Sequence, residues 1–120
     1  MKPIVYIDDE PLLCRVFTKI FESAGAPVVA FTDPEAAIAY LRDHEAAVII
    51  CDYRMPSLTG LDVLDRIPPG TPFFLVSGDL AITLAKSDPR VTDILTKPFR
   101  AEALLERVRA YVPLSDIPDA

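Results

Sequence analysis

Acidic, hydroxyl and ammonium side chains follow four short apolar segments of this 120-residue sequence: Asp8-Asp9-Glu10, Asp52, Ser77-Gly78 and Thr96-Lys97-Pro98. Carboxylates held a few ångströms apart repel each other, so such a cluster either binds a proton or recruits a cation. Magnesium is the natural cation here, because it binds one or two carboxylates together with a phosphate and keeps several waters. A carboxylate can also accept a phosphoryl group covalently.

Phosphoryl transfer onto an aspartate would use all of these groups. The transferred group needs in-line positioning and neutralisation of its equatorial oxygens. Magnesium can cover one such oxygen and Lys97 another, while the Ser77 hydroxyl and a backbone N–H near Arg54 or Gly78 can cover the rest. Each feature also has an ordinary interpretation: helix capping for residues 8–10, a loop acid for Asp52, a solvated Lys97 and a simple turn at residues 77–78. All four features follow predicted strands, and this shared position favours one common functional site over four unrelated features.

The elements that position these groups are readable from the apolar pattern. Residues 4–7, 28–31, 47–51 and 73–76 are near-continuous apolar runs, which are typical of parallel strands covered on both faces. A fifth strand, at residues 94–96, is weaker. Helical patterns fall between them at residues 11–24, from the Thr32-Asp33-Pro34-Glu35 start to residue 41, and at residues 61–67, 80–87 and 101–112.

The order is therefore strand and helix alternating five times. Such alternation predicts an α/β fold with a doubly wound, five-stranded parallel sheet and helices on both faces. In open sheets of this kind, ligands bind outside the carboxyl ends of the strands. We expect one domain over residues 1–112 and a short, loosely held tail over residues 113–120, which is too short to be an output domain.

Composition excludes several classes of protein. The net charge of −6 argues against a DNA-binding surface, which needs clustered lysine and arginine. No apolar run approaches the roughly 20 residues of a membrane helix, and the apolar start at residues 4–7 is too short for a signal peptide. Cys14 and Cys51 are interpreted as buried thiols in a reducing compartment. We therefore expect a cytoplasmic protein without direct nucleic-acid or membrane binding.

From residue 2 to about residue 112, the sequence resembles the receiver domains of two-component response regulators. The matching motifs are Ile-Val-Tyr-Ile-Asp-Asp-Glu-Pro at 4–11, Ile-Ile-Cys-Asp-Tyr-Arg-Met-Pro at 49–56, Gly-Leu-Asp at 60–62, Leu-Val-Ser-Gly at 75–78 and Asp-Ile-Leu-Thr-Lys-Pro-Phe at 93–99. The resemblance implies a flavodoxin-like (βα)5 fold with strand order 2-1-3-4-5. It also implies a phosphohistidine donor, on a sensor histidine kinase or a phosphotransfer protein.

The resemblance assigns a role to each matching residue. Asp52 matches the phosphoacceptor, and Asp9 matches the direct ligand of Mg2+, for which Mn2+ is a substitute. Asp8 matches the acid that acts partly through metal-bound water, and Arg54 matches the position whose backbone carbonyl binds the metal. The phosphoryl-binding and switch residues are Ser77, Lys97 and Gly78. The bond between Lys97 and Pro98 is expected to be cis.

Three departures from the family pattern affect the expected mechanism. Ile94 stands where the family usually has a tyrosine or phenylalanine whose ring swings inward, so the usual aromatic switch is lacking. The segment before Lys97 is shortened, which predicts a short fourth helix. Arg54 and Asp79 flank the expected path of attacking water, and we assign them as candidate modulators of phosphoryl lifetime that pair across the pocket mouth.

Three functions compete at this point. The first is a phosphorylation-switched signalling receiver that acts by binding an unknown downstream protein or by phosphorelay. The second is a constitutive interaction module with the same fold, which Ile94 favours mildly. The third, a phosphatase, is disfavoured because Arg54 stands where an acid–base carboxylate would be needed. We expect no enzymatic activity beyond self-phosphotransfer and autodephosphorylation. The sequence leaves open the kinase, the pathway, a homodimer and excision from a larger protein.

Overall fold

The computed structural model describes residues 1–78 and 88–115. Its strands form one parallel sheet in the order β2-β1-β3-β4-β5, which confirms the predicted topology. The elements are β1 (Ile4–Ile7), α1 (Pro11–Ser23), β2 (Val28–Phe31), α2 (Pro34–Asp43), β3 (Val48–Asp52), α3 (Gly60–Arg66), β4 (Phe73–Ser77), β5 (Asp93–Thr96) and α5 (Ala101–Val108). Asp79 and the predicted helix at residues 80–87 lie outside the described residues.

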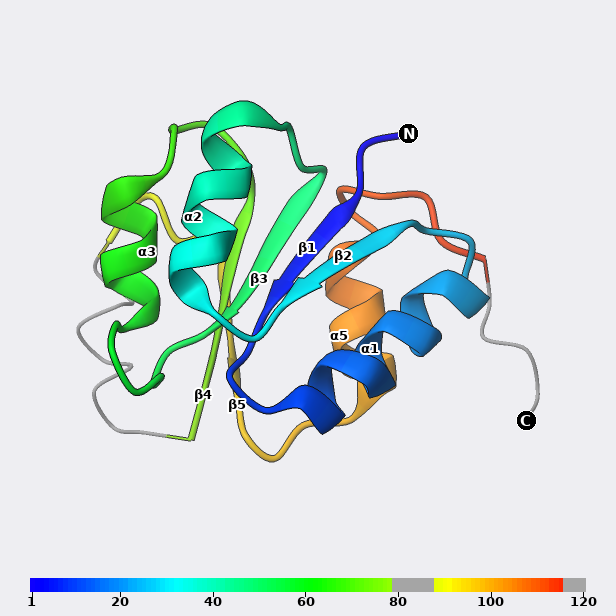
Figure 1. The fold of residues 1–120 in the computed structure, drawn as a ribbon. Coiled ribbons are helices and arrows are strands. Elements are labelled where there is room, and N and C mark those ends of the chain that lie inside the picture. Colours follow the sequence, from blue (N-terminus) through cyan, green and yellow to red (C-terminus); the bar gives the residue numbers. More distant parts are fainter. Residues whose placement is uncertain (79–87, 116–120) are drawn as a thin grey trace.

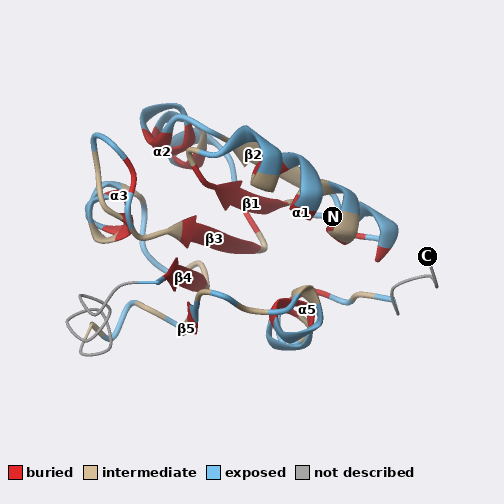
Figure 2. Cartoon of the chain, turned by 90° about the horizontal axis from the view of Figure 1, so that it is seen from below, coloured by how far each residue is buried: buried red, intermediate tan, exposed pale blue. Residues whose placement is uncertain are grey.

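Helices cover both faces of the sheet. α1 and α5 lie together on one face, and α2 and α3 cover the other (Figure 1). We call the two cores the α1/α5 cluster, which contains Phe17 and Leu104, and the α2/α3 cluster, which contains Ile38 and Val63. Buried residues concentrate on the strands while the outer faces of the helices are exposed (Figure 2). The edge strand β2 is only half-buried, because one of its sides has no neighbour.

Local sequence signals set the helix starts. α1 begins at Pro11. Proline is tolerated there because the backbone N–H groups of the first turn have no acceptor within the helix. The Asp33 carboxylate accepts a hydrogen bond from the Glu35 N–H and caps α2. α3 begins with a capping box, in which the Thr59 hydroxyl and the Asp62 carboxylate each accept the other residue's N–H.

The C-terminal part of the chain differs from the expectation. α5 ends at Val108 rather than at residue 112, and beyond it the Tyr111 N–H donates to the Val108 carbonyl in a turn. Of the tail that was expected to be loosely held, the structure describes residues 113–115, where Leu114 packs against the α1/α5 cluster. No helix in residues 1–78 and 88–115 has the length and apolar character needed to cross a membrane.

Candidate functional site

The acidic residues meet where the central strands end. All five strands run in one direction, so their carboxyl ends share one edge of the sheet, the lower edge in Figure 1. Asp8 directly follows β1, and Asp52 is the last residue of the neighbouring strand β3. Carboxylate oxygens of Asp8, Asp9 and Asp52 lie within 4.8 Å of one another. We call these three residues the acidic cluster.

Asp8 is the most buried carboxylate of the acidic cluster, at 2 % exposure. Its Oδ1 accepts a hydrogen bond from the Glu10 N–H at 3.0 Å, and its Oδ2 accepts one from the Tyr6 hydroxyl at 3.5 Å. Burial raises the pKa of Asp8, and the nearby charge of Asp52 raises it further, while the Glu10 N–H opposes the rise. The fold therefore holds a carboxylate whose charge is poorly compensated.

Asp52 differs from Asp8 because it has a cationic partner. The Lys97 ammonium lies 3.3 Å from Asp52 Oδ1, and the Asp52 side chain is 11 % exposed. Burial raises the pKa of Asp52, whereas Lys97 opposes the rise by charge and by hydrogen bonding. Asp52 is thus an accessible carboxylate with a nearby ammonium, which is the arrangement a phosphoryl acceptor needs.

The last two strands bring Ser77 and Lys97 to the same edge. Ser77 ends β4 and pairs in register with Thr96 of β5. The Lys97 N–H donates to the Ser77 carbonyl at 2.9 Å, and the Lys97–Pro98 bond is cis, as expected. Ser77 is buried, with 3 % of its surface exposed. Gly78 lies beside Lys97, since a Cβ placed on it would be 3.7 Å from the lysine Cβ.

Backbone hydrogen bonds hold the loop after Asp52 against the sheet. The Tyr53 N–H donates to the Val76 carbonyl, and the Gly60 N–H donates to the Tyr53 carbonyl. A Cβ at Gly60 would lie 2.4 Å from Cδ2 of the fully buried Leu75 and 3.0 Å from the Asp52 carbonyl oxygen, so this close approach favours glycine. Arg54 is exposed within this loop. Its predicted pairing with Asp79 stays a prediction, because Asp79 lies outside the described residues.

Aromatic side chains approach the acidic cluster from an unexpected side. Ile94 is half-buried and packs against the α2/α3 cluster. On the opposite face, the Tyr6 ring stacks on Phe17 with centroids 5.2 Å apart, and Phe17 contacts Phe99 at 5.9 Å. Sequence reasoning missed the contact between Tyr6 and Asp8. A tyrosine in an otherwise aliphatic strand, two residues before an acid, was the available signal.

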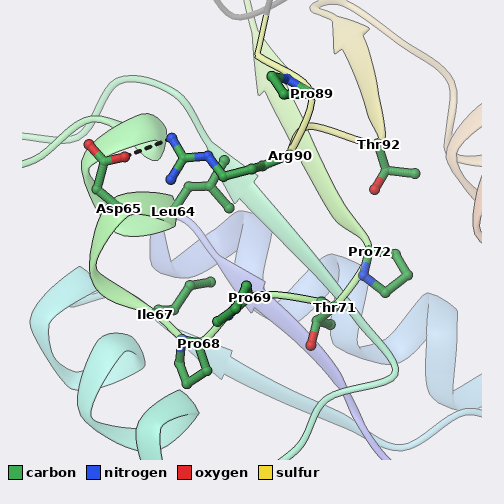
Figure 3. A pocket seen from close by; sticks show the side chains of 11 residues that line it. Leu64, Asp65, Ile67, Pro68, Pro69, Thr71, Pro72, Pro89, Arg90 and Thr92 are labelled. Atoms are coloured by element: carbon green, nitrogen blue, oxygen red, sulfur yellow. Dashed lines mark hydrogen bonds and ion pairs between the residues drawn. The ribbon is translucent and has the colours of Figure 1, made fainter.

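One cavity borders the site, and another lies away from it. One of about 450 Å³ borders the site and is lined by residues that include Tyr6, Phe17, Lys97 and Phe99. The other, of about 500 Å³, is on the far edge of the sheet (Figure 3). There Arg90 forms an ion pair with Asp65 at 2.7 Å. Of these two cavities, the first shares Tyr6 and Lys97 with the site, and the lining of the second contains no residue of the acidic cluster.

The donor set fits a hard divalent cation. Three carboxylates offer oxygen ligands within a few ångströms, and oxygen is the ligand atom that magnesium prefers. One lysine offsets only part of their negative charge. Burial is the main cause of the raised pKa values of Asp8 and Asp52, and a cation at this place would relieve the carboxylate repulsion that adds to it.

Comparison with known proteins agrees with this geometry. Residues 4–109 match the family described as the response regulator receiver domain. The chain is 30% identical to the probable transcriptional regulatory protein TcrX of Mycobacterium tuberculosis, over 91% of the chain and 49% of that protein. It is 31% identical to nodulation protein W of Bradyrhizobium diazoefficiens, over 91% of the chain and 51% of that protein. The chain thus spans about half the length of these curated relatives.

Solved structures agree on the fold. A CheY-like receiver domain protein from Methanospirillum hungatei superposes with a TM-score of 0.84 at 20% identity, covering 92% of both chains. The chemotaxis protein CheY4 of Vibrio cholerae gives a TM-score of 0.80 at 22% identity, over 93% of this chain and 99% of that one. Together with the family match over residues 4–109, these findings establish that the chain belongs to the response regulator receiver domain family.

Proposed function

We propose that this chain is a phosphorylation-switched receiver in which Asp52 accepts a phosphoryl group in a magnesium-dependent reaction. One observation carries the proposal: the acidic cluster gathers three carboxylates within 4.8 Å, and Lys97 lies 3.3 Å from the Asp52 oxygen. An aspartate that only caps a helix or faces solvent needs neither the other two carboxylates nor a lysine beside it. The set combines a nucleophile, a cation site and a fixed ammonium.

The chemistry follows from these positions. An Asp52 carboxylate oxygen attacks the phosphorus of a phosphohistidine, on a sensor histidine kinase or a phosphotransfer protein. The new O–P bond forms as the P–N bond breaks, and the leaving imidazole takes a proton from solvent. The Lys97 ammonium and the Ser77 hydroxyl neutralise phosphoryl oxygens. A magnesium ion held by Asp8, Asp9, Asp52 and the Arg54 carbonyl supplies further charge neutralisation when bound.

The phosphorylated state acts by binding a downstream protein or by passing the phosphoryl group on. We place this activity in the cytoplasm, and we assign no catalysis beyond self-phosphotransfer and autodephosphorylation. New contacts to the phosphoryl oxygens at Ser77 and Lys97 would favour one of two conformations of the fold.

A constitutive interaction module is the second candidate, favoured by Ile94 at the position of the usual aromatic switch. The two functions differ in their response to beryllofluoride, a mimic of an acyl phosphate. A switched receiver changes its partner affinity on adding beryllofluoride with magnesium. A constitutive module binds its partner equally well in both conditions.

Intact-mass measurement after incubation with acetyl phosphate tests the main proposal. We expect one phosphoryl adduct in the presence of magnesium and none after chelation. Asp52→Asn should abolish the adduct, whereas Asp43→Asn, which changes an exposed acid at the end of α2, should retain it. An adduct of equal yield in Asp52→Asn would refute Asp52 as the acceptor.

A further inference from the structure

We propose that Tyr6 is a positioning residue of the acidic cluster, and that its ring carries the state of that cluster to helix α1 through Phe17. This inference rests on the function proposed above and specifies how the site is coupled to a surface. The evidence is a series of contacts from Asp8 through Tyr6 and Phe17 to Phe99, which lies two residues after Lys97, the partner of Asp52.

The first link is the Tyr6 hydroxyl. Tyr6 is 3 % exposed, and a buried hydroxyl needs a hydrogen-bond partner. Within residues 1–78 and 88–115, that partner is Asp8 Oδ2 at 3.5 Å. This separation is longer than the 2.5–3.0 Å of most hydrogen bonds between a hydroxyl and an oxygen. The carboxylate therefore has room to move relative to the hydroxyl when a cation or a phosphoryl group arrives.

The second link is the Tyr6 ring. It stacks on Phe17 at 5.2 Å with an interplanar angle of 22°, and Phe17 contacts Phe99 at 5.9 Å. Phe17 is a buried residue in the middle of α1. Stacked aromatic pairs have defined geometry, so a displaced Tyr6 ring displaces its neighbour. Movement at Asp8 is thereby linked to α1.

The third link closes the series at Lys97. Phe99 follows Lys97 by two residues, and the Lys97 ammonium contacts Asp52 at 3.3 Å. Phe17 therefore receives contacts from both sides of the site, through Tyr6 from Asp8 and through Phe99 from Lys97. The cavity of about 450 Å³ bordered by these aromatic residues leaves space in which they can shift.

The position of these aromatic residues bears on the direction of coupling. Ile94, at the position of the usual aromatic switch, packs on the α2/α3 face. Tyr6, Phe17 and Phe99 all belong to the α1/α5 face. In this chain the aromatic contacts to the acidic cluster therefore lead to α1, on the opposite face of the sheet.

Metal affinity tests the first link. Tyr6→Phe keeps the ring and removes the hydroxyl, and we expect magnesium to bind about ten-fold more weakly by calorimetry, the lower end for loss of a group that orients a metal ligand. Tyr40→Phe is the matched control, because it removes a phenol hydroxyl from a residue packed on the α2/α3 cluster. Equal affinity in Tyr6→Phe and the wild type would overturn the role of the hydroxyl.

Selective 15N-phenylalanine labelling tests the coupling, because the six phenylalanines give a simple amide spectrum. Saturating magnesium with beryllofluoride should shift three signals in the wild type: Phe31, whose carbonyl accepts the Asp8 N–H, and Phe17 and Phe99. The signal of Phe73, which lies at the opposite end of β4 from Ser77, should not shift. In Tyr6→Leu, Phe31 and Phe99 should still shift as in the wild type, whereas the Phe17 shift should be reduced to the part that its remaining contact with Phe99 transmits.

The outcomes separate this inference from the proposed function. A Phe17 shift in Tyr6→Leu equal to that of the wild type overturns the coupling through Tyr6 and leaves phosphorylation of Asp52 intact. If Tyr6→Leu does not fold, Tyr6→Phe at saturating magnesium is measured instead, and an unchanged Phe17 shift there overturns the proposal. If the Phe31 and Phe99 signals of the wild type do not shift on adding magnesium with beryllofluoride, that result contradicts the proposed function and the role of Tyr6 together.

Discussion

Asp8→Asn should stabilise the metal-free protein while weakening its response to magnesium. The Asp8 carboxylate is 2 % exposed and lies in a cluster with two further carboxylates within 4.8 Å. Asparagine has nearly the same shape, and its amide oxygen can still accept the Glu10 N–H. The Tyr6 hydroxyl can then accept a hydrogen bond from the amide nitrogen. The substitution therefore removes a charge with little change in packing.

The magnitude follows from Coulomb's law. Two unit charges 4.8 Å apart, at an effective dielectric constant of about 20, repel by about 3 kcal/mol. The hydrogen bond from Glu10 offsets part of this repulsion, so we expect a net gain of about 1–3 kcal/mol in the free energy of unfolding. At about 4 °C per kcal/mol, the midpoint of thermal unfolding should rise by several degrees.

The gain should depend on pH in a defined direction. The pKa of Asp8 is raised above its ordinary value of 3.8, so the folded state favours the protonated acid. Such a group contributes stability that is fully present below pH 3.8 and is lost as pH rises through the raised pKa. The difference between Asp8→Asn and the wild type should thus be small at pH 3.8 and largest near neutral pH.

Urea unfolding followed by circular dichroism in chelator measures this difference, because the chain has no tryptophan. Magnesium at a hundred times its dissociation constant should add about 2.7 kcal/mol to the wild type and much less to Asp8→Asn. Glu22→Gln, an exposed acid in the last turn of α1, should change stability by less than about 0.5 kcal/mol. An Asp8→Asn protein less stable than the wild type at neutral pH would refute the reasoning.

Three further substitutions probe the surrounding structure. Gly60→Ala should cost about 1–3 kcal/mol in urea unfolding, since its Cβ would lie 2.4 Å from Leu75; an unchanged stability would contradict that close approach. Thr59→Ala removes the cap of α3 and should cost about 1 kcal/mol by the same assay, with no loss arguing against the capping box. Lys97→Met should slow phosphorylation of Asp52 by acetyl phosphate about a hundred-fold in mass kinetics, and a normal rate would exclude its charge from the reaction.

The positions of the main site residues could be predicted because parallel strands align their carboxyl ends. Asp8 and Asp52 are distant in sequence, yet each follows an apolar run that reads as a buried strand. Adjacent β1 and β3 then place them together. The ordered alternation of strands and helices predicted the layers, and the family resemblance supplied the strand order. The chemical roles of these residues remain proposals.

Other features depend on contacts that a sequence pattern does not specify. Tyr6, Phe17 and Phe99 come from β1, α1 and the segment before α5, and only the packing of these elements brings the rings together. The end of α5 was placed too late because Val112 continues the apolar pattern and is buried. It is buried after a turn rather than within the helix, so periodicity alone could not distinguish the two structures.

The central claim is that Asp52 becomes an acyl phosphate. Borohydride reduces an acyl phosphate on aspartate to homoserine, so phosphorylation followed by reduction and peptide sequencing locates the modified residue. The account predicts homoserine at position 52, formed only when both acetyl phosphate and magnesium are present. Homoserine at position 8 or 9 instead, or a phosphoryl group on another residue type, would contradict it.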